Sequence, residues 1–468
     1  MSSKLVLSLV SIAVAGGIAA AASSWYTAQK LDEYVQAGVE SINQSHVMRA
    51  SWYPQLSFPF SRGGVLHIVV LSEQMQENAK MEPVNSGDPE SLQRVQEQMA
   101  EPQTEERQKP FELYINVSNK MFPFIVKGEA TLDMSRGTPY ELVQRKAVPP
   151  SLPVSMAWTY KAYNQDFDLR LSMERWQVTQ PEHSVDVGPA EISLDGNMQD
   201  ELELNYAWEG VKATSQQPVR SEMEILPLDG VALLRNFSGI WISPEGHAQL
   251  NGMRMSDADG KAEMGQLRFD SVMDEAETET GTVLNTKQRV SLADFAIHTP
   301  QQQFTINDLS LGLNFSGLNK QGVEELALQA RAEKPDFTQM MKSLNKITTK
   351  TMRLELAPAS MKLNNAAVTA SGTLESLPFE VEQLIRASAA DTPNPFRYML
   401  QGNFTIAAET NAVRALPAEM RQQISVLQQD GFIKADNKGL SSNLQLQSGQ
   451  LTANGKNIPL GEFKLQNK

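Results

Sequence analysis

The chain has 468 residues, 41% of them hydrophobic and 21% charged, a balance that suits a globular protein of two or three domains. Its net charge of −14 is spread along the body, which argues against nucleic acid or an anionic lipid surface as a partner of the body, because both bind clustered Lys and Arg. The absence of cysteine excludes disulfides, thiolate metal sites, cysteine nucleophiles and lipoprotein processing.

The N-terminal segment Leu5–Ala22 carries no charge and is close to the length that a helix needs to cross a bilayer. Lys4 precedes the segment, and Trp25 and Tyr26 follow it where an interfacial aromatic belt would lie. Positive charge before the segment favours a cytoplasmic N-terminus. We therefore expect residues 1–26 to form a cytoplasmic stub and a single-pass anchor in a bacterial inner membrane, with the body in the periplasm.

A cleaved signal peptide is the alternative, because Ala20-Ala21-Ala22 would suit cleavage before Ser23. The residues that follow favour a retained anchor. Apolar residues continue there at helical spacing, which predicts a juxtamembrane amphipathic helix over residues 27–45. These residues are Leu31, Tyr34, Val35, Gly38, Val39 and Ile42.

The first strands are expected within residues 46–73, where Trp52 to Val70 suggests two strands around a turn at Arg62-Gly63-Gly64. Residues 74–109 are rich in Gln, Glu, Pro and Asn and hold few large apolar side chains, so they predict a polar loop or a partly helical insertion. The acidic run Asp274 to Glu279 is interpreted as a solvated loop.

From Phe111 onward the hydrophobic period is two, which predicts antiparallel strands with one apolar and one polar face. The alternating sets are Phe111, Leu113, Ile115 and Val117; Phe167, Leu169, Leu171 and Met173; Leu202, Leu204, Tyr206 and Trp208; Leu309, Leu311, Leu313 and Phe315; Met352, Leu354 and Leu356; and Leu444 and Leu446. Turns are expected at Asp195-Gly196-Asn197, Asp257 to Gly260 and Asn454-Gly455.

Three helices are expected between strand patterns, over Pro335 to Ile347, Pro378 to Ala389 and Pro417 to Gln429. The predicted fold class is mainly β, a β-rich α+β protein with an N-terminal transmembrane helix and then a long antiparallel sheet assembly with a few helical inserts. Residues 110–468 would form the β-rich periplasmic body, with a possible division into two subdomains near residues 320–350.

Motifs at both ends of the chain resemble the YdgA/YihF-like family of enterobacterial inner-membrane proteins. They are Ser24-Trp25-Tyr26-Thr27 with Lys30; Phe60-Ser61-Arg62-Gly63-Gly64; Gln429-Asp430-Gly431-Phe432-Ile433; and the stretch from Leu446 to Lys456. Ala28 stands where the family usually has Gly. The resemblance covers about 45 residues at the start and 40 at the end. It implies an inner-membrane anchor and a periplasmic domain whose function is not established.

No catalytic, cofactor-binding or metal site is expected, and we predict that the protein is not an enzyme. The histidines His46, His67, His183, His247 and His298 lack zinc spacings, and His183 beside Glu182 and Asp186 is interpreted as a solvated loop residue. Gly449 to Lys456 departs from a P-loop in glycine spacing and lacks its hydroxyl residue, so it predicts a hairpin. Asp257 to Gly260 lacks the ligands of a calcium loop.

Two functions remain open. In the first, the sheet forms a groove that shelters a lipid or another hydrophobic ligand, because few helical inserts are present to cover a broad apolar face. In the second, the protein is an envelope interaction scaffold without a small-molecule ligand, either as a homo-oligomer such as a dimer or bound to another envelope protein. The membrane is the expected partner of the N-terminal helix, and nucleic acid is not expected as a partner.

Overall fold

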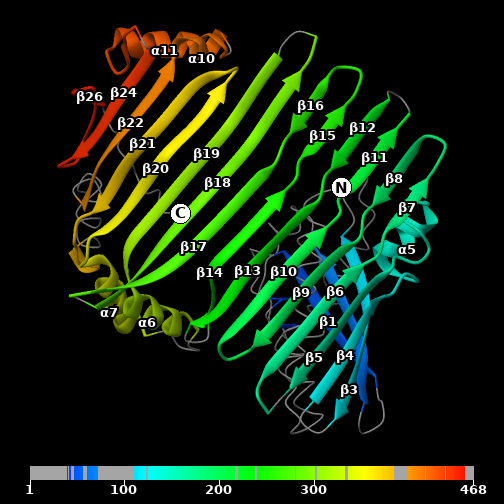
Figure 1. The fold of residues 1–468 in the computed structure, drawn as a ribbon. Coiled ribbons are helices and arrows are strands. Elements are labelled where there is room, and N and C mark those ends of the chain that lie inside the picture. Colours follow the sequence, from blue (N-terminus) through cyan, green and yellow to red (C-terminus); the bar gives the residue numbers. More distant parts are fainter. Residues whose placement is uncertain are drawn as a thin grey trace, which may run out of the picture. The chain divides into compact units, whose positions relative to one another are not determined.

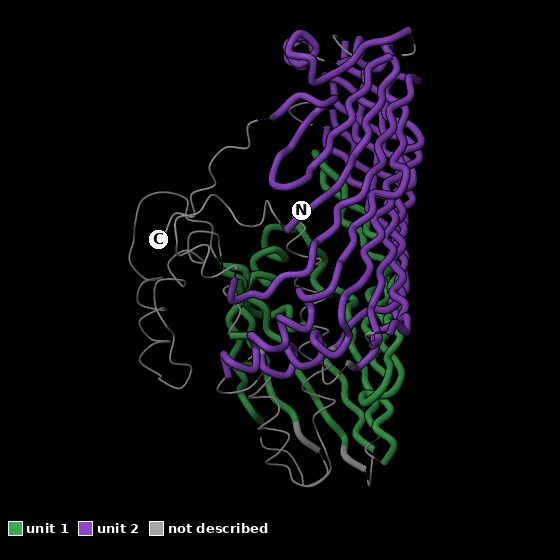
Figure 2. Tube along the Cα trace, turned by 90° about the vertical axis from the view of Figure 1, so that its left-hand side faces the viewer, with its two compact units in different colours: residues 1–209 green, residues 210–468 purple. Residues whose placement is uncertain are grey.

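The computed structural model describes residues 39–40, 42–43, 47–55, 61–71, 110–122, 125–161, 163–216, 220–237, 240–279, 281–300, 303–331, 336–383, 399–416, 418–437 and 439–458. The expected anchor Leu5–Ala22, most of the expected helix 27–45 and the polar segment 74–109 lie outside these residues. The chain divides into two compact units, Met1–Glu209 and Gly210–Lys468 (Figure 2). The interval 320–350 lies within unit 2.

Unit 1 is an antiparallel sheet with the strand order β1-β2-β3-β4-β5-β6-β9-β10. Along the chain, β7 and β8 form a separate hairpin in the connection from β6 to β9. Helix α5 (Gly137–Gln144) follows β4. The strands are β1 (Met48–Gln55), β2 (Ser61–Val70), β3 (Phe111–Phe122), β4 (Ile125–Leu132), β5 (Val154–Lys161), β6 (Asp166–Met173), β7 (Trp176–Thr179), β8 (His183–Val187), β9 (Ala190–Asn197) and β10 (Glu201–Trp208).

Two tryptophans of unit 1 lie over glycines of the neighbouring strand. A Cβ at Gly64 would be 2.4 Å from the Trp52 ring, and one at Gly128 would be 2.0 Å from the Trp158 ring. Each Gly therefore makes room for an aromatic ring that covers the sheet. This corrects the turn expected at Arg62-Gly63-Gly64, because these residues lie inside β2 and Gly64 is required beneath an aromatic ring.

Unit 2 is a longer antiparallel sheet with the order β13-β14-β17-β18-β19-β20-β21-β22-β24-β25-β26 (Figure 1). A second ladder, β11-β12-β15-β16, joins the last residues of β18, and β23 pairs with part of β24. The strands are β11 (Val211–Ser215), β12 (Ser221–Ile225), β13 (Leu228–Phe237), β14 (Ile240–Leu250), β15 (Met253–Ser256), β16 (Lys261–Met264), β17 (Leu267–Thr278), β18 (Gly281–His298), β19 (Gln303–Asn319), β20 (Met352–Leu363), β21 (Ala366–Ser376), β22 (Leu400–Glu409), β23 (Lys434–Ala435), β24 (Gly439–Gln447), β25 (Gln450–Ala453) and β26 (Lys456–Ile458).

Four helices of unit 2 lie near the ends of its strands. Helices α6 (Lys320–Arg331) and α7 (Phe337–Thr348) connect β19 to β20, and α10 (Thr410–Arg414) and α11 (Ala418–Gln429) follow β22 (Figure 1). Asp336 caps α7, since its carboxylate accepts from Thr338 N at 2.8 Å. The predicted helices at Pro335 to Ile347 and Pro417 to Gln429 are thus confirmed as α7 and α11, while the second half of Pro378 to Ala389 lies outside the described residues.

An irregular position occurs at the same height in five neighbouring strand lines of unit 2. These lines are the consecutive strand pairs β12/β13, β14/β15 and β16/β17, and the single long strands β18 and β19. Apolar residues flank each position with a step of three instead of two: Ile225 to Leu228, Leu250 to Met253, Met264 to Leu267, Leu292 to Phe295 and Ile306 to Leu309. We call the residues between these pairs the crease. Backbone pairing continues through it, as Leu226 N donates to Gly252 O at 2.9 Å and Gly265 N donates to Asp294 O at 2.7 Å. In β20 the equivalent register shift lies between Leu356 and Ala359.

The β-rich antiparallel architecture predicted from alternation is confirmed, and each alternating set lies in a strand of the structure. The turns at Asp257 to Gly260 and Asn454-Gly455 are also confirmed, between β15 and β16 and between β25 and β26. The turn expected at Asp195-Gly196-Asn197 is wrong, because these residues pair with β6 as the end of β9 and the chain bends at 198–200. The loop expected at Asp274 to Glu279 is wrong, because Asp274 to Thr278 belong to β17. Partners on a neighbouring strand and a helix hold this charged strand: Asp274 accepts from Asn285 Nδ2 of β18 at 2.9 Å, and Glu275 pairs with Lys320 at the start of α6 at 2.7 Å.

Candidate functional site: the apolar face of unit 2

One face of the unit 2 sheet is apolar across β14 to β24. Residues that are paired across antiparallel strands lie on the same side of a sheet, so the register identifies the members of this face. Leu313 is opposite Leu356, Leu354 is opposite Leu374, and Phe404 is opposite Leu444. The large members, which we call the apolar face, are Leu250, Leu267, Phe269, Val290, Leu292, Leu309, Leu311, Leu313, Phe315, Leu354, Leu356, Leu374, Phe404, Ile406, Leu444 and Leu446.

The side chains of the apolar face are not packed in a closed core. None of its large members is buried, and Phe269 and Ile406 are 40% and 43% exposed. Unit 1 provides the contrast: Val126, Phe167 and Leu169 are 1%, 3% and 2% exposed. Contiguous sets of partly exposed Leu and Phe are uncommon on the surface of soluble proteins, where such patches are typical of interaction sites for a protein, a membrane or a ligand.

Two small cores lie at the ends of the apolar face. At one end Val283, Leu284, Ala327, Met341 and Ile347 are buried where α6 and α7 pack against β18 and β19. At the other end, Leu363, Ala366 and Ala412 form a buried cluster with residues of α10 and the strand ends around it. The described helices that pack on this sheet therefore cover the ends of its strands and leave the apolar residues between them partly exposed.

The interface between α6 and α7 is tied by polar contacts. Asn319 is buried, and its Oδ1 accepts from Gly322 N at 2.8 Å, which satisfies a donor at the start of α6. Glu325 pairs with Lys346 of α7, and this hydrogen bond lowers the pKa of the Glu325 carboxyl. These contacts hold the helix pair against one end of the sheet.

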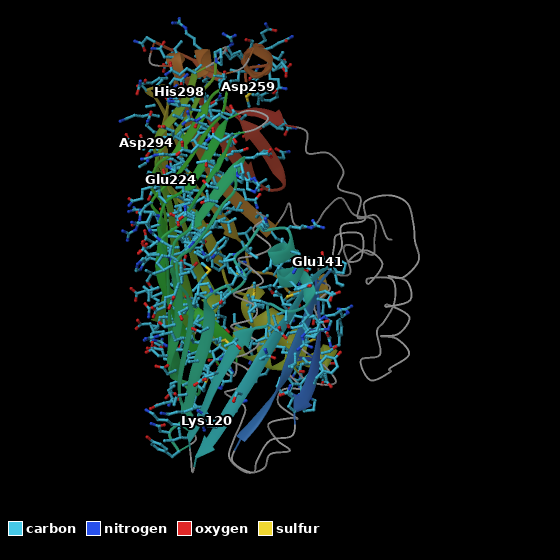
Figure 3. The ribbon with its side chains drawn as sticks, turned by 90° about the vertical axis from the view of Figure 1, so that its right-hand side faces the viewer. Lys120, Glu141, Glu224, Asp259, Asp294 and His298 are labelled. Atoms are coloured by element: carbon cyan, nitrogen blue, oxygen red, sulfur yellow. The ribbon has the colours of Figure 1, made fainter. Side chains whose placement is uncertain are left out.

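The opposite face of the same sheet is charged and paired. Arg268 donates to Asp270 at 2.7 Å, Lys287 lies 3.3 Å from Asp274, and Arg353 lies 3.7 Å from Glu375. The hydrogen bond from Arg268 lowers the pKa of Asp270. Figure 3 shows Glu224, Asp294 and His298 along one side of the sheet. Water solvates this face, so a hydrophobic ligand would have one side of the sheet available.

The apolar face continues through the crease. Strand β21 has no offset, so Val368 and Leu374 lie on one side of it. Val368 pairs with Met361 beyond the crease, and Leu374 pairs with Leu354 before it. The extra residue in each neighbouring strand therefore keeps apolar side chains on one face where uninterrupted alternation would have moved them to the other. Without the crease, the sheet would present charges beyond this line.

The histidines do not form a common site. His67 lies in β2, His183 begins β8, His247 lies in β14 and His298 ends β18, whereas His46 is outside the described residues. His183 is therefore in a strand and not in the expected loop. Within the ranges that the structure describes, no three His, Asp or Glu side chains are grouped so as to hold a metal ion.

His67 belongs to a stacked cluster in unit 1 that the sequence did not indicate. Its ring stacks on Tyr114 with centroids 4.2 Å apart, and the Arg136 guanidinium lies 4.5 Å from the centroid of the Tyr114 ring. Glu112 Oε2 is 3.6 Å from His67 Nε2. Burial lowers the pKa of His67, and the Glu112 carboxylate opposes this shift. The cluster joins β2 and β3 to the residues that precede α5.

Among the described residues, which do not include Leu5–Ala22, no helix has the length and hydropathy of a membrane span. The chain is thus a β-rich protein whose second unit presents a long sheet with one charged face and one partly uncovered apolar face.

The model of the family described as bacterial protein of unknown function (DUF945) matches residues 152–461, and the chain belongs to this family. The match includes the resembling stretch from Gln429 to Lys456 and excludes the motifs before residue 152. Neither the curated proteins nor the solved structures include a match to the chain.

Proposed function

We propose that the protein is a non-enzymatic lipid-binding protein of the bacterial inner membrane, and that the apolar face of unit 2 holds acyl chains. The single observation that carries the proposal is a broad set of Leu and Phe side chains that stay partly exposed between two helix-covered ends. The opposite face is charged, so the two faces of the sheet differ sharply in polarity.

The energetics allow such binding without a closed pocket. Removing a methylene from water contributes about 0.8 kcal/mol, so about ten buried methylenes offer about 8 kcal/mol before ordering losses. This corresponds to dissociation constants no tighter than about micromolar, which suit a ligand that must also leave. The large side chains of the apolar face carry no charge, and Glu275, which lies on the same side of β17, pairs with Lys320, so the headgroup of a bound lipid would remain in solvent.

The location belongs to the same proposal. Leu5–Ala22 would hold the chain in the inner membrane, as in the YdgA/YihF-like proteins that the terminal motifs resemble, and the two units would lie in the periplasm near a source of lipid. N-terminal sequencing of the mature chain tests the anchor. A mature protein that begins at Ser23 would contradict it.

Site-specific cross-linking tests the ligand. A photoreactive amino acid is placed at Leu311 on the apolar face or at Ser310, its neighbour on the opposite face of β19. The full-length chain is expressed in bacteria, irradiated, and its adducts are identified by mass spectrometry. We expect phospholipid adducts at position 311 and none at position 310. Equal labelling at both positions, or adducts at 311 that are only protein, would contradict lipid binding by this face.

A further inference from the structure

Beyond the crease the apolar face changes in composition. Met223 of β12 is opposite Met255 of β15, and Met253 of β15 is opposite Met264 of β16. Ile225 is opposite Met253 and Phe295 is opposite Met264, so these positions belong to the same side as the apolar face. We call Met223, Met253, Met255 and Met264 the methionine patch.

Four methionines at adjoining paired positions are not what strand formation favours. Strands prefer β-branched and aromatic residues, whereas Met is flexible and carries a polarisable thioether. Met255 is 45% exposed and the other three are partly exposed. Helices α6 and α7 pack on β18 and β19, and α10 packs on β21 and β22, so these contacts lie on other strands than the patch.

We propose that the methionine patch is an oxidation site at which peroxide weakens the binding of hydrophobic ligands. The thioether sulfur attacks one oxygen of hydrogen peroxide, an S–O bond forms, and the O–O bond breaks to release hydroxide. The oxygen now on sulfur gives up its proton to this hydroxide, which leaves as water. Sulfur is oxidised to the sulfoxide and peroxide is reduced. A flexible apolar side chain becomes a polar one with a strong acceptor oxygen.

The effect on the ligand rests on the proposed function. An acyl chain that covers a sulfoxide removes its oxygen from water and offers no donor in return, which lowers affinity roughly tenfold for each group so covered. The charged residues near the patch, such as Arg254 and Glu224, pair with each other on the opposite face at 3.4 Å and do not compensate the oxygen.

The test uses the full-length chain treated with hydrogen peroxide, which is then removed with catalase. The chain is mixed with vesicles of phosphatidylethanolamine and phosphatidylglycerol that contain a phospholipid with a photoreactive acyl chain. Cross-linked peptides of β12 to β19 are quantified by mass spectrometry. We expect peroxide to lower their yield at least tenfold in the unmodified chain and to have little effect on the M223L/M253L/M255L/M264L variant, because Leu matches Met in volume and cannot be oxidised.

Two controls separate the inference from the proposed function. M420L removes a methionine of α11 that is 51% exposed and lies off the apolar face, and this variant should respond to peroxide as the unmodified chain does. Oxidation rates need no lipid: Met255 should be oxidised faster than Met156, which is 5% exposed. Equal rates, or an unchanged yield after oxidation of all four methionines, would overturn the inference. If the untreated chain shows no cross-links on this face, the proposed function fails, whatever the rates.

Discussion

The partial exposure of the apolar face should be evident in how much its side chains contribute to the free energy of unfolding. Phe167 in unit 1 and Phe269 in unit 2 are both strand residues, but they are 3% and 40% exposed. Truncating a buried Phe to Ala removes its transfer free energy and leaves a cavity, so Phe167→Ala should lower the free energy of unfolding of unit 1 by about 3–5 kcal/mol.

For Phe269→Ala the expected loss is smaller. About 60% of the side chain is removed from water, and full burial of a Phe contributes about 1.5–3 kcal/mol, so the variant should lose about 1–2 kcal/mol with no enclosed cavity to add. Urea unfolding followed by hydrogen-exchange mass spectrometry reports β6 and β17 separately. If the two substitutions have equal effects, Phe269 is packed as in a closed core and the apolar face cannot be a ligand surface.

Three further outcomes are expected. Gly128→Ala should destabilise unit 1 by about 1–3 kcal/mol in urea unfolding, because its Cβ would overlap the Trp158 ring, and Trp158→Leu in the same chain should recover part of the loss; no recovery would contradict the overlap. Asn319→Ala should lower stability by about 1 kcal/mol and raise exchange at Gly322 specifically, since that amide loses its acceptor; unchanged exchange there would count against the cap. Burial holds the pKa of His67 below 6.5, so below that pH the unfolded chain binds a proton that the folded chain resists. The free energy of unfolding therefore falls as the pH drops from 6.5 toward the pKa of the folded state. In His67→Phe the urea midpoint should depend less on pH over this range, and an equal dependence would refute the assignment.

Alternation in the sequence predicted the strands that hold the alternating sets, such as β3, β6 and β19, because a half-covered antiparallel strand must place apolar residues at every second position. It could not show which of these residues are covered. Phe167 and Phe269 look alike in the sequence, and their different burial depends on segments distant along the chain. The apolar face as a set is therefore a property of the register and of the helices that pack on it.

The predictions that the structure corrects can be traced to particular residues. Asp and Glu are depleted in strands, so the acidic run from Asp274 did not indicate one, and the partners Asn285, Lys287 and Lys320 lie far enough along the chain to escape a local pattern. Helix α6 was not predicted, because it follows β19 directly without a turn residue. The crease did leave a signal, since the stretches ILPL, LNGM, MGQL, LADF and INDL each place two apolar residues three apart around turn-forming or polar ones.

The crease also limits how the lengths of these strands can change. A deletion of one residue between Leu250 and Met253 would shift the phase of β15 alone, turning its methionines toward the charged face of the sheet and Arg254 toward the side of the apolar face. Neighbouring strands could restore the match only by losing a residue at the same height. Length variation among family members should therefore occur in the hairpin turns and not in the crease. At the crease, a strand of unit 2 should lose or gain a residue only where its neighbours do so at the same height.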